Sequence, residues 1–600
     1  MLSLGWSTTI AALLASANSL IRERDHAPHG LYSWPHNHEL ADEYDYVIVG
    51  GGVAGMVLAE QLSEDPRISV LLLEAGPDGT NSSTINTPAY AALNDHTPYT
   101  WNYTSQPDPN LNGARPALAQ GHTWGGGSAV NYMAYCRGAA STFNEWADIS
   151  GDPGLAWANL SQEFKATTRY EEPNNTSYQE VINTSLYGDG PLIVSRQLDL
   201  GGFDPYYHEA LMAELDLQNV DLNIGTGIGA TLGYQTVRPS NRTRYYALEA
   251  YGWRMAGRPN VQLLHSAWAS KIGFEDKRAR SVTYVTLNDK QTHVINAKEV
   301  IVSSGALGSP KLLMLSGIGP REHLEDLGIP VVLDAPDVGS NLYDHHFSVV
   351  EVEVTPNVNS AHKFSNATYL AEVTAQYKDT ATGILANVLS GSFAVARVPD
   401  DVLEAANDTF HLSIPPDRGH LLYQFAGAAF VQPAPNTSIL SPFVSLVQPE
   451  ASGYLRLNGT DFMNDPLIYS NYYGSDGDKA AILYGYKKLR AVLQSPLLAD
   501  VIVGEVFPGA NVTTDVELME AIKRSAQTFH HPLGTVSMGK VLDSDFRIRG
   551  LDGIRVVDSS TFPYPPVCHL QADVYAVAHM VARAIMEEDY SRVHAERSGT

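Results

Sequence analysis

A glycine cluster between two apolar runs constrains the fold of this chain more than any other feature. Residues 46–49 are typical of a buried strand, residues 54–62 of a helix rich in small and apolar side chains, and residues 69–73 of a second buried strand. The glycines that separate the first strand from the helix follow the pattern G-x-G-x-x-G, at Gly50, Gly52 and Gly55. The segment is therefore predicted to be a βαβ unit in a parallel sheet, with a ligand at the strand ends.

The glycine cluster also predicts the kind of ligand. Glycines let the backbone turn tightly and approach a pyrophosphate, whose charge is favoured by the exposed N–H groups at the start of the helix. Glu74 ends the second strand and can accept hydrogen bonds from an adenosine ribose. A lone glycine run would indicate only a tight loop, but the flanking strands and Glu74 favour a dinucleotide, either FAD or NAD.

The rest of the chain indicates a second domain interleaved with the first. The length of 600 residues exceeds that of one simple domain, and 44% apolar residues can form a large core. Between about 344 and 465 the pattern changes to alternating runs such as 349–354, which are typical of an antiparallel sheet. A strand at 554–557 and a helix at 572–586 return to the first pattern. We expect an α/β nucleotide-binding domain on a parallel sheet, and an α+β substrate domain on an antiparallel sheet.

The N-terminus indicates export. An apolar stretch over residues 8–15 ends in small residues, as in a signal peptide, and is shorter than the ~20 apolar residues that span a bilayer; a buried helix is the alternative. Sequons for N-linked glycans support a secreted protein or one of the cell wall; they begin at Asn81, Asn102, Asn159, Asn174, Asn175, Asn183, Asn241, Asn366, Asn407, Asn436, Asn458 and Asn511. The expected boundaries are a signal peptide at 1–17, an arm at 18–43, the nucleotide-binding domain at 44–150, 240–345 and 540–600, and the substrate domain at 151–239 and 346–539.

Charge and cysteine content exclude several classes of protein. Acidic residues number 66 against 39 basic ones, and the net charge of −27 repels nucleic-acid phosphates; no membrane span is expected beyond the N-terminus. The histidines of the N-terminal arm lack an ordered ligand spacing, so no metal site is expected there. Cys136 and Cys568 are too few for a disulfide framework, and whether they pair depends on their distance in the fold.

Two further glycine-rich segments decide between FAD and NAD. Residues 121–131 hold too many glycines for a helix or strand interior, so their backbone must lie close to another group. Residues 305–319 follow a buried strand at 300–302. These two segments resemble the signatures of the glucose-methanol-choline (GMC) oxidoreductases, nearest their aryl-alcohol oxidase and patulin synthase-like members. The resemblance covers residues 44–587.

The resemblance implies FAD bound across the βαβ unit, with the isoalloxazine reaching residues 125–131. The implied cofactor contacts are Gly50, Gly52, Gly55, Glu74, Gly126, Gly127, Asn131, Ala269, Asp558 and Leu570. Some members attach FAD through a histidine that would align with Val130, so non-covalent FAD is expected here. His122 and Trp124 depart from the family pattern and would alter packing near the flavin.

Two histidines are the expected catalytic residues. The run His530-His531-Pro532-Leu533-Gly534-Thr535 resembles the family's His-Pro-x-Gly-Thr segment and implies that His531 is the general base. The run Pro566-Val567-Cys568-His569 places His569 where the family carries His or Asn, to orient the substrate hydroxyl. The helix expected near residue 571 would direct its N-terminal dipole at the flavin.

The resemblance implies oxidation of a primary alcohol, aromatic, furanic or polyketide-derived, by hydride transfer to flavin N5, with oxygen or a quinone as electron acceptor. Three alternatives stay open: a flavin-containing cyclase without net redox change, a sugar oxidase or dehydrogenase of the same family, and a non-catalytic FAD-binding protein. His530 would favour an oxygenated substrate, or it faces away and bonds backbone, and Leu570 replaces a common proline. For Asp344 and His345 a structural role is expected, and for Cys568 a buried filler rather than a reactive thiol.

Overall fold

The computed structural model describes residues 40–598 except 175, 177–180, 199–201, 360–362, 365, 389–390 and 432–436, with side chains up to residue 591. The predicted signal peptide at 1–17 and the arm up to residue 39 lie outside the described residues. None of the helices in the described part is long and apolar enough to cross a membrane.

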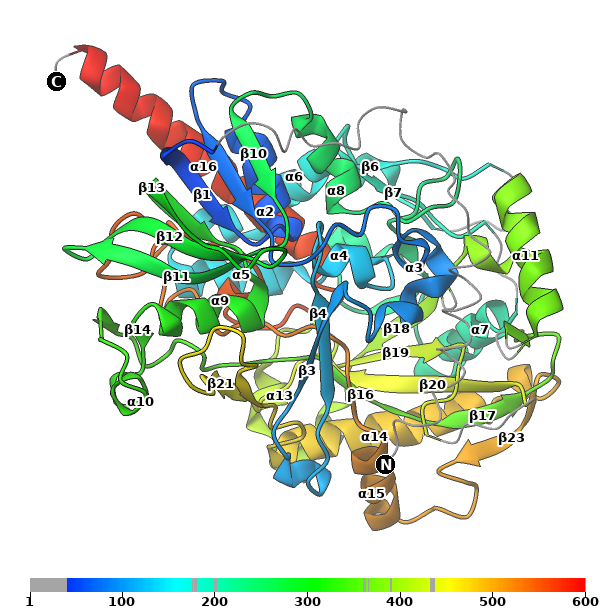
Figure 1. The fold of residues 1–600 in the computed structure, drawn as a ribbon. Helices are drawn as coiled ribbons and strands as arrows, with labels where there is room; N and C mark the ends of the chain where they lie inside the picture. Colours follow the sequence, from blue (N-terminus) through cyan, green and yellow to red (C-terminus); the bar gives the residue numbers. More distant parts are fainter. Residues whose placement is uncertain are drawn as a thin grey trace.

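The first sheet contains the predicted βαβ unit (Figure 1). Five of its strands run parallel, in the order β10 (Val261–Leu264), β2 (Val70–Leu73), β1 (Glu43–Val49), β13 (Thr292–Val302) and β25 (Ile554–Val556). Two antiparallel strands extend it beyond β13, namely β12 (Arg278–Thr286) and β11 (Ala267–Glu275). The strands predicted at 46–49, 69–73, 300–302 and 554–557 all lie in this sheet, which confirms the expected fold class.

Two helices cover this sheet at the nucleotide-binding end. The helix α2 (Val53–Leu62) follows the glycine cluster directly, and it is buried along most of its length. The long helix α16 (Gln571–Ser598) packs against α2, so the last segment of the chain lies beside the first βαβ unit. The helix predicted at 572–586 is therefore confirmed, and it begins next to His569.

The second sheet is antiparallel and lies on the other side of the molecule (Figure 1). It is built from β23 (Ile502–Phe507), β17 (Glu351–Val354), β20 (Ile439–Leu446), β19 (Leu421–Ala426), β18 (Ser392–Ala396), β8 (Gly229–Leu232), β16 (His346–Val349) and β24 (Gln527–Thr528). The alternating run 349–354 is antiparallel as predicted, but it is split between β16 and β17. The helices α7 (Asp204–Leu215) and α14 (Asp476–Leu493) pack on this sheet. The domain boundaries expected from the sequence stay predictions.

A disulfide joins Cys136 to Cys568, although the two residues are 432 positions apart in sequence. Both cysteines are buried in an apolar cluster with Phe347, Phe393 and Phe443. Cys568 is therefore buried as expected, and the disulfide answers the question of pairing that the sequence left open. Pairing could not be predicted because it is decided by a distance that only the fold creates.

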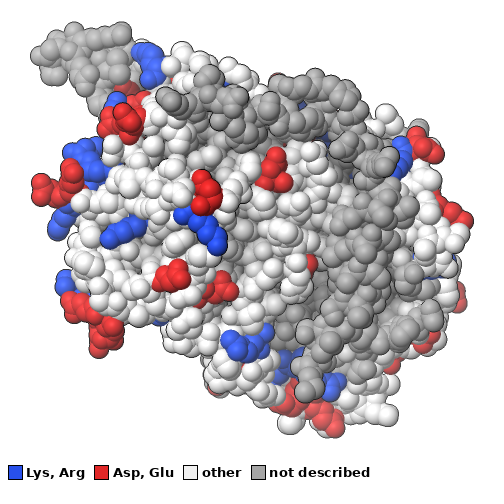
Figure 2. Space-filling view, viewed as in Figure 1, with Lys and Arg blue, Asp and Glu red and all other residues white. Residues whose placement is uncertain are grey.

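Charged side chains are mixed on the surface. On the described part of the face shown in Figure 2, acidic and basic side chains lie in small groups, and they form no continuous basic patch there. The expected absence of a nucleic-acid partner stays a prediction.

Candidate active site

The glycine cluster after β1 leaves no room for side chains at two of its positions. A Cβ on Gly50 would lie 2.2 Å from the carbonyl oxygen of Ser303, and the φ of Gly50 is +112°. A Cβ on Gly55 would lie 1.9 Å from the carbonyl oxygen of Gly50. These glycines therefore hold α2 tightly against the strands, as the predicted dinucleotide-binding turn requires.

Glu74 closes the same turn from the end of β2. Its two carboxylate oxygens accept hydrogen bonds from the N–H groups of Gly51 and Gly76, each at 2.8 Å. Burial raises the pKa of Glu74 to about 7. The carboxylate is thus fixed beside the glycine cluster, where each oxygen retains a second lone pair for a ligand hydroxyl.

The second glycine segment meets the first. Gly126 has a φ of +51°, and a Cβ there would lie 2.7 Å from the Cα of Gly52. Gly127 begins the short helix α4 (Gly127–Val130), and a Cβ on it would have nothing within 4 Å. The side-chain oxygen of Asn131 accepts hydrogen bonds from the N–H of Met133, at 2.9 Å, and from Arg244, at 2.8 Å. The predicted contacts of both segments therefore come together at one place.

The remaining predicted cofactor contacts, Ala269, Leu570 and Asp558, come from three separate parts of the chain. Ala269 lies in β11, and Leu570 lies between His569 and α16; both are buried. Asp558 follows β25 and accepts hydrogen bonds from the N–H of Gly305, at 2.8 Å, and from the hydroxyl of Ser309, at 2.6 Å. Asp558 therefore ties the second signature segment to the C-terminal strand, and its contact with FAD stays a prediction.

The arrangement fits a dinucleotide cofactor. No side chain caps the N-terminus of α2, and the open face of Gly127 leaves backbone accessible beside it. Several buried polar atoms nearby have no partner among the described residues, including the indole N–H of Trp124 and both carboxyl oxygens of Asp573 in the first turn of α16. Such groups are expected where a polar ligand completes the hydrogen bonding.

The two predicted catalytic histidines are brought together by the fold. The ring centroids of His531 and His569 are 5.3 Å apart, and the rings are nearly perpendicular. His531 follows β24 of the antiparallel sheet, whereas His569 precedes α16. The pair therefore lies where the two halves of the molecule meet.

A third histidine contacts the first. Nδ1 of His345 lies 3.0 Å from Nδ1 of His531. The preceding residue, Asp344, accepts a hydrogen bond from the backbone N–H of His531, at 2.9 Å, and another from the hydroxyl of Thr528, at 2.6 Å. The sequence analysis expected only a structural role for Asp344 and His345, and it missed this contact.

Burial keeps the three histidines neutral. It lowers the pKa of His531 well below 6.5, and the nearby rings of His345 and His569 lower it further. Burial also lowers the pKa of His569 to about 4. The pKa of His345 falls to about 3, through burial first and then the rings of His569 and His346. A neutral imidazole can accept a proton, so His531 is suited to act as a base.

His530 takes an unusual backbone conformation, with a φ of +59°. Its N–H donates to the hydroxyl oxygen of Thr528 at 2.8 Å, while its buried Nδ1 has no partner in the described part of the chain. The choice between a substrate-facing and a backbone-bonded His530 stays open.

Aromatic rings surround the histidine pair. The ring of Phe529 lies 4.9 Å from that of His531 and 5.2 Å from that of His569, between centroids. The ring of Phe393 lies 5.7 Å from His569, edge-on. Behind them Phe347 and Phe443 pack at 4.4 Å. The surroundings of the pair are therefore mainly apolar and aromatic.

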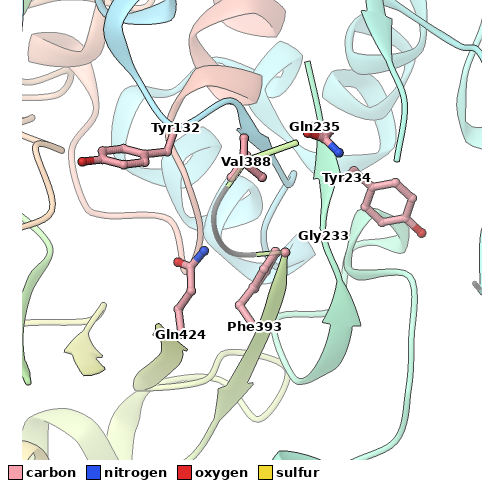
Figure 3. Close-up of a pocket in the computed structure, with 9 residues that line it drawn as sticks. Tyr132, Gly233, Tyr234, Gln235, Val388, Phe393 and Gln424 are labelled. Carbon is pink, nitrogen blue, oxygen red and sulfur yellow. The ribbon is translucent and has the colours of Figure 1, made fainter. Parts of the chain in front are cut away.

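A small cavity borders this aromatic group at Phe393 (Figure 3). It measures about 10 Å³, enough for about one water molecule. Its lining includes the half-exposed Tyr132 and also Gln235, Phe393 and Gln424. The side-chain amide of Gln235 is buried, and neither its oxygen nor its nitrogen has a partner among the described residues. The cavity thus offers a hydrogen-bond donor and an acceptor one aromatic ring away from His569.

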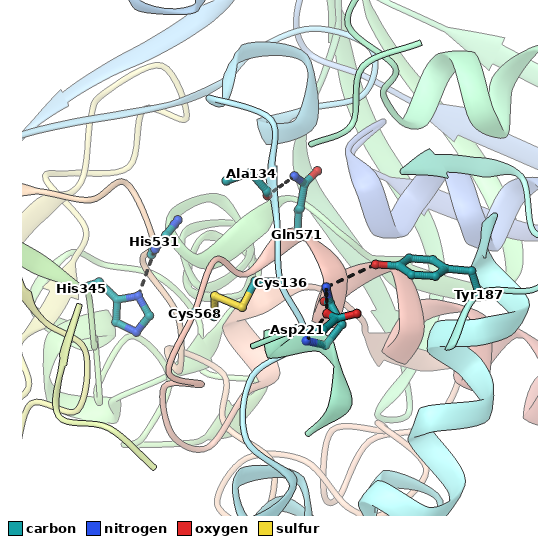
Figure 4. The surroundings of a disulfide bond; sticks show 9 residues. Ala134, Cys136, Tyr187, Asp221, His345, His531, Cys568 and Gln571 are labelled. Carbon is teal, nitrogen blue, oxygen red and sulfur yellow. Dashed lines mark hydrogen bonds between the residues drawn. A yellow bond between two sulfur atoms is a disulfide. The ribbon is translucent and has the colours of Figure 1, made fainter. Parts of the chain in front are cut away.

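The disulfide lies next to the histidines (Figure 4). Cys568 directly precedes His569, and Cys136 directly follows β5 (Ala134–Tyr135). The side-chain N–H of Gln571 also donates to the carbonyl oxygen of Ala134. The segment that carries His569 is therefore joined to β5 on both sides of the histidine.

The chain belongs to the GMC oxidoreductase family. The N-terminal model of that family matches residues 44–347, and the C-terminal model matches residues 449–578. Members of this family bind FAD, so the chain is an FAD-dependent oxidoreductase. The resemblance predicted from the glycine segments is confirmed.

Several relatives cover nearly the whole chain. Pyranose dehydrogenase 3 of Leucoagaricus meleagris is 31% identical over 92% of this chain and 94% of its own length. Patulin synthase of Aspergillus clavatus is 31% identical over 90% of this chain and 91% of its own length. The structure of a fungal aryl-alcohol oxidase superposes with a TM-score of 0.79 at 26% identity, over 92% of this chain and all of that one.

Proposed function

We propose that the protein oxidises a primary aromatic, furanic or polyketide-derived alcohol, as part of secondary metabolism. The observation that carries this proposal is the pair of neighbouring histidines, His531 and His569, beside the rings of Phe529 and Phe393. Apolar aromatic rings favour a flat, apolar substrate over a sugar, whose hydroxyl groups would lose their hydrogen bonds to water there.

The two histidines have different roles at the substrate hydroxyl. His531 accepts the hydroxyl proton, which a neutral imidazole can do. His569 orients the same hydroxyl through Nε2, which has no partner among the described residues. Bound FAD supplies the acceptor for the hydride, at flavin N5, and oxygen or a quinone then takes the two electrons. General-base catalysis of this kind contributes ~100- to 10,000-fold.

The cavity beside Phe393 supports a substrate with a polar group remote from the reacting carbon. The free amide of Gln235 offers one donor and one acceptor. A carbonyl or carboxamide on the far side of an aromatic ring would pair with it through a water molecule, since the cavity itself holds only about one water. The same amide is the feature that favours the second candidate, a sugar oxidase or dehydrogenase, because a sugar hydroxyl would also pair with it.

Three further properties belong to this proposal. Val130 has no nucleophilic atom, which supports non-covalent FAD. The disulfide and the sequons support a secreted or cell-wall protein with N-linked glycans, because disulfides persist in oxidising compartments. The surface negative charge supports a small-molecule substrate rather than nucleic acid.

Anaerobic mixing of the FAD-loaded enzyme with a panel of alcohols tests the proposal. The panel holds benzylic, furanic and sugar alcohols, including 4-(hydroxymethyl)benzamide and its apolar isostere 4-isopropylbenzyl alcohol. We expect bleaching of the flavin by benzylic or furanic alcohols, faster with the carboxamide. Flavin that stays yellow with all of them, together with conversion of a polyketide, would favour the cyclase; bleaching by sugars alone would favour the sugar oxidase.

A further inference from the structure

The contact between His345 and His531 restricts where the proton of each ring lies. Their Nδ1 atoms are 3.0 Å apart, and the planes of the two rings are nearly perpendicular, at 80°. Two neutral imidazoles can share such a contact only if one Nδ1 carries a proton and the other does not. The contact therefore couples the tautomers of the two rings.

The role of His531 as the base decides which ring donates. Nδ1 of His531 faces His345, so His531 can accept the substrate proton only at Nε2. A neutral imidazole with a free lone pair on Nε2 carries its own proton on Nδ1. Nδ1 of His345 is then the acceptor, and His531 donates.

We infer that His345 is a positioning residue that holds His531 in the Nδ1–H tautomer, so that Nε2 of His531 keeps its lone pair for the substrate proton. In Figure 4 the second ring nitrogen of His531 points away from His345. A partner on one imidazole nitrogen sets the state of the other in many catalytic and metal-binding histidines. This inference rests on the proposed function, because the tautomer follows from His531 acting as the base.

The neighbouring groups agree with this assignment. The titratable groups that face His531 are the rings of His345, His569 and His530. Those that face His345, besides His531, are the rings of His569 and His346. A proton on any of these rings would repel a second one, so His345 stays neutral and remains able to accept. Asp344 holds the backbone N–H of His531, so two adjacent residues fix both its main chain and its ring.

Histidine nitrogen spectra of the FAD-loaded enzyme test the tautomer directly. The protein is labelled with ¹⁵N-histidine, and the signals of His531 are assigned by their loss in His531→Gln. We expect a protonated Nδ1 and an unprotonated Nε2 in the wild type, and a gain of the Nε2–H form in His345→Leu. A wild-type Nε2 that already carries the proton would overturn the inference, whichever alcohol the enzyme oxidises.

A variant of His345 that keeps a hydrogen-bond acceptor separates the positioning of His531 from simple packing. The side-chain oxygen of His345→Asn can accept from Nδ1 of His531, whereas His345→Leu cannot. With 4-methoxybenzyl alcohol we expect the limiting rate of flavin reduction to fall about 10- to 100-fold in His345→Leu, with an unchanged dissociation constant, and to recover largely in His345→Asn. Equal rates in the two variants would contradict the inference.

A histidine outside the site provides the control. His293 is exposed in β13, and its ring stacks on that of Tyr284 at 5.1 Å between centroids. His293→Phe keeps the stacking, and we expect it to change neither the tautomer of His531 nor the rate of flavin reduction. Flavin absorbance and the unfolding midpoint of each variant show that it is folded and loaded. If no alcohol reduces the wild-type flavin, the proposed function fails, while the nitrogen spectra still decide the tautomer.

Discussion

The cofactor side and the histidine side of the molecule are built in different ways. On the cofactor side, the turn from β1 to α2 and the carboxylate of Glu74 come from 32 consecutive residues, 43–74. On the histidine side, the site is assembled from three short segments, which together span more than 200 positions of the sequence: 344–345, 528–531 and 568–569. A short sequence motif can therefore encode the cofactor side, whereas the histidine side forms only once both sheets have formed.

This difference predicts which property, FAD binding or reaction rate, a mutation on each side should change. A fault in the glycine turn changes the backbone of the first βαβ unit and so the binding of FAD. A fault in a histidine removes one side chain from a site held by other segments, so FAD should remain bound while the reaction fails. Four predictions test that separation.

The largest effect is expected from Gly55→Ala. The new Cβ would lie 1.9 Å from the carbonyl oxygen of Gly50, so α2 must move away from the strands. We expect loss of bound flavin and a lower yield of folded protein, measured as the ratio of flavin to protein absorbance. Gly504→Ala is the matched control, because a Cβ there has nothing within 4 Å. Full flavin content in Gly55→Ala would show that the turn tolerates a side chain.

His531→Ala should separate binding from reaction. We expect the rate of flavin reduction to fall by ~100- to 10,000-fold, since the general base is lost, with the flavin content unchanged. Stopped-flow absorbance under nitrogen measures the rate. His293→Ala, which alters an exposed histidine in β13, should behave like the wild type. Unchanged turnover in His531→Ala would remove this residue from the mechanism.

The disulfide connects the two sides, and its loss should affect both moderately. In Cys136→Ala with Cys568→Ala we expect the free energy of unfolding to fall by about 2 to 5 kcal/mol, as for other native disulfides. Flavin reduction should slow as well, because Cys568 directly precedes His569. Denaturant unfolding and the same rate measurement give the two values. A slower rate without any loss of stability would mean that the bond serves only to place His569.

The smallest effect is expected from pH. Since burial lowers the pKa of His531, the ring stays unprotonated while the pH falls through 6.5, and it loses its base form only below its own pKa. We expect the limiting rate of flavin reduction to change less than about twofold between pH 8 and pH 6. A histidine with the ordinary pKa near 6.5 would lose about three quarters of its neutral form by pH 6. A decline of that size would mean that the ring is less buried during the reaction.

Sequence reasoning succeeded where the chemistry is local. The strand, glycine turn and helix at 46–62 are determined by apolar runs and by the steric needs of Gly50 and Gly55. The proximity of His531 and His569 was predictable only through the family resemblance, because they are 38 positions apart on different elements. The contact between His345 and His531 and the pairing of Cys136 with Cys568 could not be predicted. Both depend on how the antiparallel sheet packs against the first domain, which no local pattern encodes.

The bond between Cys136 and Cys568 has a consequence for a chain that has been cut. Any break of the backbone between these two residues leaves the fragments covalently linked, since 432 positions lie within the bridged loop. A protease that nicks an exposed loop of the substrate side would thus produce a band of unchanged mass on a gel without reducing agent. The two pieces would separate only after reduction in denaturant, because both sulfur atoms are buried in the folded protein.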